Sequence, residues 1–149
     1  MLSRGAVTLA NAAGKLQTLQ VSLLADENKD VVEHFEPYGF TSCPKAGAEV
    51  LAAFLDGDRS HGVVVVAADR RYRIKALQAG EVAIYDDLGH KIKLTRTGIV
   101  IDGATHNISI INCPQVTVAG GDVVADGISL KTHKHGGVQS GSAQTGVPV

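Results

Sequence analysis

The stretch Ile92-Lys93-Leu94-Thr95-Arg96-Thr97-Gly98-Ile99-Val100-Ile101 decides the fold of the second half of this chain. Two triplets that begin and end with an aliphatic residue flank a polar turn with a glycine, which is typical of two short β-strands. Similar triplets recur with Gly, Asp or Asn often between them: Val82-Ala83-Ile84, Ile92-Lys93-Leu94, Ile99-Val100-Ile101, Ile108-Ser109-Ile110, Val116-Thr117-Val118 and Ile128-Ser129-Leu130. A degenerate short-strand repeat of this kind predicts a β-helix or another solenoid.

Composition separates this repeat from the first half of the chain. All six aromatic residues lie at or before position 85, and no charged residue occurs from Gly103 to Gly121. The first half therefore reads as a compact domain with large core residues. We expect a boundary near residues 78–81 and three parts: a barrel at 1–80, the β repeat at 81–132 and a tip at 133–149.

The first half predicts short strands separated by polar turns. Strands are expected at 16–23, 31–35 and 62–67, with turns at 26–30, 37–40 and 56–60. Residues 48–54 could be helix or strand, and we prefer a strand. The continuous β-branched run at 62–67 is typical of a strand buried on both faces. About five such strands predict an all-β fold that begins with a small barrel of the OB type.

Charge and composition exclude several classes of protein. The net charge is −1 and the sequence pI is about 6.6, so no general basic field exists for a nucleic-acid partner. Residues 1–25 lack a signal-peptide pattern, and the apolar run at 63–68 is far short of the roughly 20 residues that span a bilayer. We therefore expect a soluble chain made in a cytoplasm. Cys43 and Cys113 fit no CxxC pattern, and we expect two buried free thiols rather than a disulfide.

The repeat has too little apolar material for a core of its own. Each triplet supplies two inward aliphatic residues, and the ordering of each residue costs roughly 1–2 kcal/mol. Three identical chains wound together would share one core and would cover the strand edges that a lone chain exposes. The alternative is an ordinary half of a β-sandwich closed by the first domain.

A histidine pair closes the repeat in the stretch Ser129-Leu130-Lys131-Thr132-His133-Lys134-His135-Gly136-Gly137. On a strand, His133 and His135 would point to the same side. Three copies of the pair would supply six imidazole nitrogens, which suit octahedral iron or nickel better than four-coordinate zinc. Such a closed shell predicts a structural metal site, whereas the alternative is two exposed histidines beside a tail.

Two enzyme classes share part of this pattern. Gly127, His133 and His135 match the opening of the cupin metal motif, but the expected glutamate is absent and Gln139 is the nearest substitute. A metallo-hydrolase motif would need Asp-His where Gly137-Val138 stands. We therefore expect no enzyme, and two alternatives stay open: a cupin-type metal-dependent enzyme, and an OB-type trimeric adaptor without metal.

The other candidate ligands have simpler interpretations. His34, His61, His90 and His106 are expected to be structural or solvated. Asp122 and Asp126 would suit a hard cation such as calcium if three copies pointed inward, but loop positions are favoured. The cluster Asp69-Arg70-Arg71-Tyr72-Arg73 is typical of a solvated interface, since stacking aromatics are scarce there.

Taken in order, these segments resemble a known family. A small barrel precedes short β repeats, the His-x-His-Gly-Gly stretch and a terminal Thr145-Gly146-Val147-Pro148. This order is similar to the central spike, or baseplate assembly protein V, of contractile-tailed bacteriophages. The stretches Glu33-His34-Phe35-Glu36-Pro37-Tyr38-Gly39 and Gly57-Asp58-Arg59-Ser60-His61-Gly62 resemble the Mu-like members most closely.

The resemblance implies an architecture and a role. It implies a homotrimer, an OB-fold barrel that docks on the phage tail hub protein, and a triple-stranded β-helix needle. It also implies one iron ion per trimer, bound by His133 and His135 of three chains, with calcium and chloride inside the needle and Asp126 as a candidate ligand. The implied place is the tail baseplate of the virion, after synthesis in the host cytoplasm. The implied role is to pierce the host outer membrane during tail contraction, with no catalysis and no nucleic-acid partner.

Overall fold

The computed structural model describes residues 1–24, 27–137 and 141 and divides the chain into two compact units. The first unit is Met1–Asn107, and the second is Ile108–Val149. We describe each unit by itself. The boundary expected near residue 80 falls inside the first unit, between a barrel and a three-stranded sheet, and the expected division of the chain stays a prediction.

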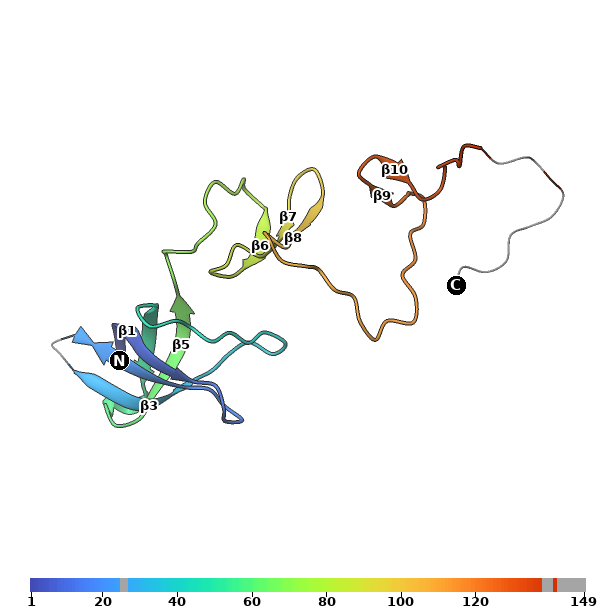
Figure 1. The fold of residues 1–149 in the computed structure, drawn as a ribbon. Helices are drawn as coiled ribbons and strands as arrows, with labels where there is room; N and C mark the ends of the chain where they lie inside the picture. Colours follow the sequence, from blue (N-terminus) through green and yellow to red (C-terminus); the bar gives the residue numbers. More distant parts are fainter. Residues whose placement is uncertain (25–26, 138–140, 142–149) are drawn as a thin grey trace. The chain divides into compact units, whose positions relative to one another are not determined.

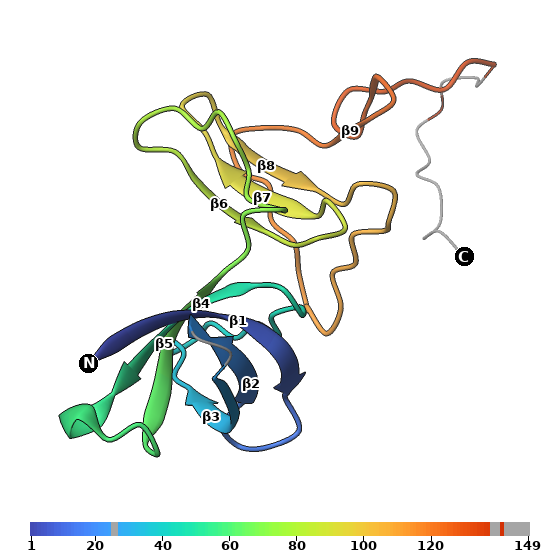
Figure 2. The ribbon, with the colours of Figure 1, turned by 90° about the vertical axis from the view of Figure 1, so that its left-hand side faces the viewer.

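Five strands form a closed barrel in the first unit (Figures 1 and 2). They are β1 (Leu2–Asn11), β2 (Thr18–Leu23), β3 (Asn28–His34), β4 (Glu49–Phe54) and β5 (Gly62–Ala68). The order around the barrel is β1-β2-β3-β5-β4, and β3 pairs with β5 in parallel while the other pairs are antiparallel. A single turn of 3-10 helix, η2 (Leu55–Gly57), links β4 to β5. The expectation of an all-β chain that begins with a small barrel is confirmed.

The barrel core comes from strands with strict alternation. Every second residue of β2 and of β4 is buried, as expected for strands with one face on a core. The buried hydrophobic residues are Val7, Leu19, Val21, Leu23, Val32, Ala48, Val50, Ala52, Phe54 and Val64. These small and medium side chains fill the barrel, and Phe54 is the one aromatic residue of the six that is buried. The expectation of large core residues was therefore wrong.

Strand β1 was missed because its sequence does not alternate. Only Val7 of β1 is buried, although the strand pairs with both β2 and β4. Gly5 permits a close approach to β2, since a Cβ there would lie 2.5 Å from the Ser22 carbonyl oxygen. Hydrogen bonding on two edges, rather than hydrophobic patterning, holds this strand in place.

Two expectations about burial were wrong. Strand β5 is hydrogen-bonded on both edges, but Val65 and Val66 are each 48% exposed. The β4–β5 register shifts at Val65, which has no partner on β4, so the alternation of the strand is interrupted there. Cys43 and Cys113 are both free, as expected, yet both are exposed rather than buried.

The second sheet lies in the first unit and is built from the repeat. Its strands are β6 (Val82–Tyr85), β7 (Lys91–Leu94) and β8 (Ile99–Asp102), in the antiparallel order β6-β7-β8. The triplets that begin at residues 82, 92 and 99 therefore form strands, as predicted.

The second unit contains one short hairpin, β9 (Val124–Ala125) and β10 (Ile128–Ser129). Asp126 and Gly127 connect the strands with positive φ angles of 47° and 82°, which is the backbone of a type I′ turn and the reason for an Asp-Gly sequence. The triplets at 108–110 and 116–118 are not strands in the single chain. No helix in the described part of the chain is long and apolar enough to cross a membrane.

We expect Leu19→Ala to lower the stability of the barrel by about 2–5 kcal/mol, since Leu19 is fully buried and its loss leaves a cavity. Leu9→Ala is the matched control, because Leu9 is 61% exposed on neighbouring β1 and should change stability by less than ~0.5 kcal/mol. Urea denaturation followed by circular dichroism measures both. Equal losses would show that the core is placed wrongly.

Candidate functional site

One face of the β6-β7-β8 sheet is entirely aliphatic. Residues directly opposite each other in an antiparallel ladder share a face, and the register pairs Val82 with Leu94 and Leu94 with Ile99. The next row pairs Ile84 with Ile92 and Ile92 with Ile101. We call these residues the aliphatic face: Val82, Ile84, Ile92, Leu94, Ile99 and Ile101. Each of the six is between 42% and 72% exposed in the single chain.

The opposite face of the same sheet is suited to water. Lys91 lies directly opposite Asp102, and its Nζ is 2.7 Å from the carboxylate. Lys93 lies opposite Ala83 on one side and Val100 on the other. The two faces therefore differ sharply, and only the aliphatic face lacks a solvent-compatible surface.

The second unit also leaves its aliphatic side chains uncovered. Its large aliphatic residues are between 47% and 78% exposed: Ile108, Ile110, Ile111, Val116, Val118, Val123, Val124, Ile128 and Leu130. No residue after Val64 is buried, within the ranges that the structure describes. The repeat is thus an apolar segment without an apolar interior.

His133 and His135 lie side by side, but not on a strand. The chain turns at residues 130–132, and His133 follows that turn, so the expectation of a strand across this pair was wrong. The two rings nevertheless meet edge to face, with centroids 5.1 Å apart and an angle of 82° between their planes. Residues 138–149, apart from Gly141, lie outside the described part of the chain, including Gln139.

A hydrogen-bond network orders the turn that carries His133. Asp122 accepts hydrogen bonds from the Ser129 hydroxyl and, at 3.1 Å, from the Lys131 amide. The Ser129 hydroxyl in turn accepts from the amide and the hydroxyl of Thr132, at 2.8 and 2.7 Å. The Ser129 hydroxyl holds the pKa of Asp122 below its ordinary value, so the carboxylate is ionised at neutral pH. Asp122 therefore works as an anchor for the turn.

This turn also fixes the tautomer of the neutral His133 ring. Nδ1 lies 2.8 Å from the Ser129 carbonyl oxygen and 3.1 Å from that of Leu130. Carbonyl oxygens only accept, so Nδ1 carries the proton and donates it. In the neutral ring, Nε2 then keeps its lone pair for a metal, as is usual for ligating histidines held by a backbone carbonyl. The free Nε2 of His133 fits the expected metal ion. A single chain does not supply the remaining ligands, since among the described residues no group of three or more His, Cys, Asp or Glu side chains could hold a metal.

The other candidate ligands have structural roles in the chain. Asp126 occupies the I′ turn, and Asp122 is engaged by the network above. His34 is buried at 4% exposure, and no partner of its Nδ1 is found in the described structure. His90 and His106, which lie far apart in sequence, come within hydrogen-bonding distance of each other, at 2.9 Å. Spacing could not have identified that pair.

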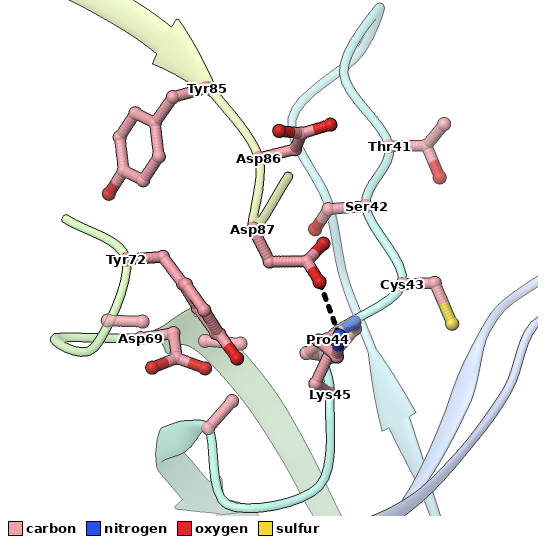
Figure 3. A pocket seen from close by; sticks show the side chains of 13 residues that line it. Thr41, Ser42, Cys43, Pro44, Lys45, Asp69, Tyr72, Tyr85, Asp86 and Asp87 are labelled. Carbon is pink, nitrogen blue, oxygen red and sulfur yellow. Dashed lines mark hydrogen bonds and ion pairs between the residues drawn. The ribbon is translucent and has the colours of Figure 1, made fainter. Parts of the chain in front are cut away.

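A pocket of about 520 Å³ lies between the barrel loops and the end of β6 (Figure 3). Its labelled lining residues are Thr41, Ser42, Cys43, Pro44, Lys45, Asp69, Tyr72, Tyr85, Asp86 and Asp87. Lys45 forms an ion pair with Asp87, which raises the pKa of Lys45 and keeps it protonated. The Cys43 side chain projects away from that pair. A protonated lysine cannot act as nucleophile or base, so the pair works as a link between the barrel and the sheet.

The arginine cluster is also used within the chain. Arg70 forms an ion pair with Glu49, and Arg71 binds Asp69 at 2.6 Å and the Ala46 carbonyl at 3.0 Å. Arg71 outweighs desolvation at Asp69 and lowers the pKa of that carboxyl. These contacts tie the loop after β5 to the barrel.

Comparison with known proteins identifies the class. Residues 4–71 match the family described as "Bacteriophage Mu Gp45, N-terminal", and residues 127–149 match the "GpV Apex motif", which contains His133 and His135. The chain is 38% identical over 137 residues to "Baseplate puncturing device gp45" of Escherichia phage Mu, covering 88% of this chain and 70% of that protein. It is 34% identical over 157 residues to "Mu-like prophage FluMu protein gp45" of Haemophilus influenzae, covering 91% and 86%.

A barrel, a strand repeat with an uncovered apolar face and an apex motif thus define a phage baseplate spike protein. Within that class, the chain belongs to the Mu gp45 family. Its place is the tail baseplate, where it assembles with other tail proteins.

We expect Asp122→Ala to raise the amide hydrogen-exchange rate of residues 129–133 by roughly tenfold or more, because the turn loses its anchor. Asp126→Asn is the matched control, since Asn tolerates the positive φ of this turn and leaves the network intact. The wild-type protection should persist at neutral pH and be lost as the pH falls through the lowered pKa of Asp122. Unchanged exchange in Asp122→Ala would contradict the anchoring role.

Proposed function

We propose that this protein is the homotrimeric central spike of a phage tail, a needle with an iron ion at its tip that pierces the host outer membrane during tail contraction. The observation that carries the proposal is the aliphatic face, which leaves six Val, Ile and Leu side chains exposed on one side of a sheet. Three copies of this face, turned toward a common axis, form a narrow triple-stranded β-helix.

The energy of burial supports this assembly. Covering six half-exposed aliphatic side chains is worth roughly 5–10 kcal/mol per chain. The exposed residues of the second unit extend the same benefit along the repeat. Pairing between chains would also give backbone partners to the triplets at 108–110 and 116–118, which have no strand partner in the single chain. Other copies of this chain are the simplest partner for the aliphatic face, because each copy carries the same exposed face.

At the tip, His133 and His135 of three chains would hold one iron ion through six imidazole nitrogens. The Nδ1–H of His133 is already committed to backbone carbonyls, which leaves Nε2 for the metal. An iron ion held in this way supplies a cross-link between three chain ends, where fraying is otherwise greatest. Calcium and chloride ions inside the needle belong to the same proposal, with Asp126 as a candidate ligand.

The barrel, which we take to be of the OB type, would dock on the tail hub protein. Its outer surface exposes Val65 and Val66 on β5 and the aromatic residues Phe35, Tyr38 and Phe40 on the loop after β3. Such apolar groups suit a protein partner better than solvent. Piercing needs no catalysis: tail contraction supplies the force, and the needle must only stay folded under it. The printed name of the phage Mu relative, a baseplate puncturing device, supports this role.

We expect the 149-residue chain to form particles of three times its 15.5 kDa mass in solution. Ile92→Glu should convert most of it to single chains at micromolar concentration, because a carboxylate buried without a partner costs several kcal/mol. Lys93→Glu is the matched control, since it places the same side chain one residue away on the opposite face. Light scattering after size exclusion measures both. A single-chain mass for the unmodified protein would refute the needle.

We expect one iron per three chains by elemental analysis, with no exchangeable ligand. His133→Ala combined with His135→Ala should lose the iron yet stay trimeric, because the aliphatic layers hold the chains together. Phage particles that carry this double variant should assemble but infect with reduced efficiency.

The same measurements separate the alternatives. One metal per chain with an open position would favour a cupin-type enzyme, and a trimer without metal would favour an adaptor. A monomeric double variant would show that the metal, rather than the aliphatic face, holds the chains together.

A further inference from the structure

Three titratable side chains meet at one end of the β6-β7-β8 sheet, far in sequence from the apex. Asp86 and His90 belong to the loop between β6 and β7, and His106 belongs to the loop after β8. The ladder brings the two loops together, since Lys91 at the start of β7 pairs with Asp102 at the end of β8. The proposed function assigns no role to this group.

Asp86 orients the His90 ring. Its Oδ2 lies 2.5 Å from His90 Nδ1, and its Oδ1 accepts from the amides of Leu88 and His90 at 2.9 and 3.0 Å. Desolvation raises the pKa of Asp86. The hydrogen bonds from His90 and from these amides lower that pKa by more, so the carboxylate is ionised at neutral pH. An ionised carboxylate only accepts, so His90 Nδ1 carries a proton and His90 Nε2 faces away from Asp86.

His90 Nε2 faces His106 Nδ1 at 2.9 Å, with ring centroids 4.7 Å apart and an interplanar angle of 69°. The two nitrogens share one proton, because a hydrogen bond needs one donor and one acceptor. His106 is held there by its own turn, in which its amide donates to the Gly103 carbonyl at 2.8 Å. Two imidazole nitrogens are thus preorganised side by side.

Their 2.9 Å separation is that of a hydrogen bond, and it also allows both nitrogens to bind one metal ion once the shared proton has left. Two nitrogens at adjacent corners of a tetragonal site, each about 2.0–2.1 Å from the metal, lie about 2.9 Å apart, whereas a tetrahedral site needs about 3.3 Å. Tetragonal sites with nitrogen ligands favour Cu²⁺ or Ni²⁺, and Cu²⁺ binds more tightly in the general affinity order. A carboxylate on the distal nitrogen of a ligating histidine is the usual outer partner in metal sites.

We propose that His90 and His106 form a second metal site on this chain, a two-histidine site for Cu²⁺ or Ni²⁺ in which Asp86 positions the His90 ring. His90 Nε2 and His106 Nδ1 are the ligands, and the proton that they share moves to His106 Nε2 or to solvent when the metal binds. Asp86 is engaged by His90 Nδ1 and by two amides, and among the described residues no group of three or more His, Cys, Asp or Glu side chains could hold a metal ion. Water or an added ligand therefore completes the coordination. The site is therefore open, unlike the closed shell proposed for His133 and His135.

The test is Cu²⁺ titration of the full-length protein that carries His133→Ala and His135→Ala, which removes the apex ligands. Calorimetry should show one Cu²⁺ per chain, and pulsed electron paramagnetic resonance should detect two coordinated imidazoles. His106→Asn should weaken binding at least tenfold and leave one imidazole. Asp86→Asn should weaken binding about tenfold with both imidazoles retained, as for other outer partners of ligating histidines.

The matched control is His61→Asn, since His61 is an exposed histidine beside a turn of the barrel and should leave affinity unchanged. An equal loss in His61→Asn, or no loss in His106→Asn, would show scattered binding at surface histidines and overturn the site. If a variant fails to fold, the imidazole count of the parent protein decides: one imidazole per Cu²⁺ overturns the proposal. If the unmodified protein holds no apex iron but Cu²⁺ still binds at His90 and His106, only the proposed function is contradicted.

Discussion

The rest of this structure depends on one imbalance: the buried hydrophobic core lies in the first half of the chain, whereas hydrophobic residues continue far beyond it. The barrel closes around its own buried side chains, the last of which is Val64. Beyond Val64, no described residue is buried, although Val, Ile and Leu remain frequent to residue 130. A segment of this composition becomes stable only when other surfaces cover it. The aliphatic face is thus exposed in the single chain, and any assembly that stabilises it must cover this face with another apolar surface.

A shared core of the kind proposed would have a weak point at its end. Layers in the middle of the repeat would gain neighbours above and below, but the last turn before His133 would have them on one side only. The network from Asp122 through Ser129 to Thr132 replaces part of that missing packing with hydrogen bonds within the chain. It also presents His133 with a fixed tautomer. Local polar order and a metal cross-link would therefore act where hydrophobic packing runs out.

Sequence patterns predicted those parts of the fold in which the hydrophobicity of each residue matches its burial or its place in a strand. Alternation predicted β2, and at 48–54 a strand was preferred to a helix. The triplets at 82, 92 and 99 formed strands, although their aliphatic ends are exposed in the single chain. Strand β1 was missed because edge hydrogen bonds hold it, and only Val7 carries a hydrophobic signal. Burial of Val65 and Val66 was overpredicted, since a continuous apolar run does not reveal where the strand register shifts or whether both faces are covered. The triplets at 108–110 and 116–118 show the same limit, because strand pairing depends on a partner that local sequence does not contain.

The two histidine pairs show why candidate sites differ in how easily they are predicted. His133 and His135 are two residues apart, so spacing alone brought them together, although a turn rather than a strand places the rings. His90 and His106 meet only because the β7-β8 register aligns Lys91 with Asp102, and no local motif encodes that register. The sequence alone does offer Asp86 as a partner of His90, since the two residues are four apart in a short loop and a carboxylate can orient a histidine ring. In the proposed assembly the apex would depend on symmetry between chains, whereas the second pair depends on register within one chain. Variants at one pair should therefore leave the other unchanged.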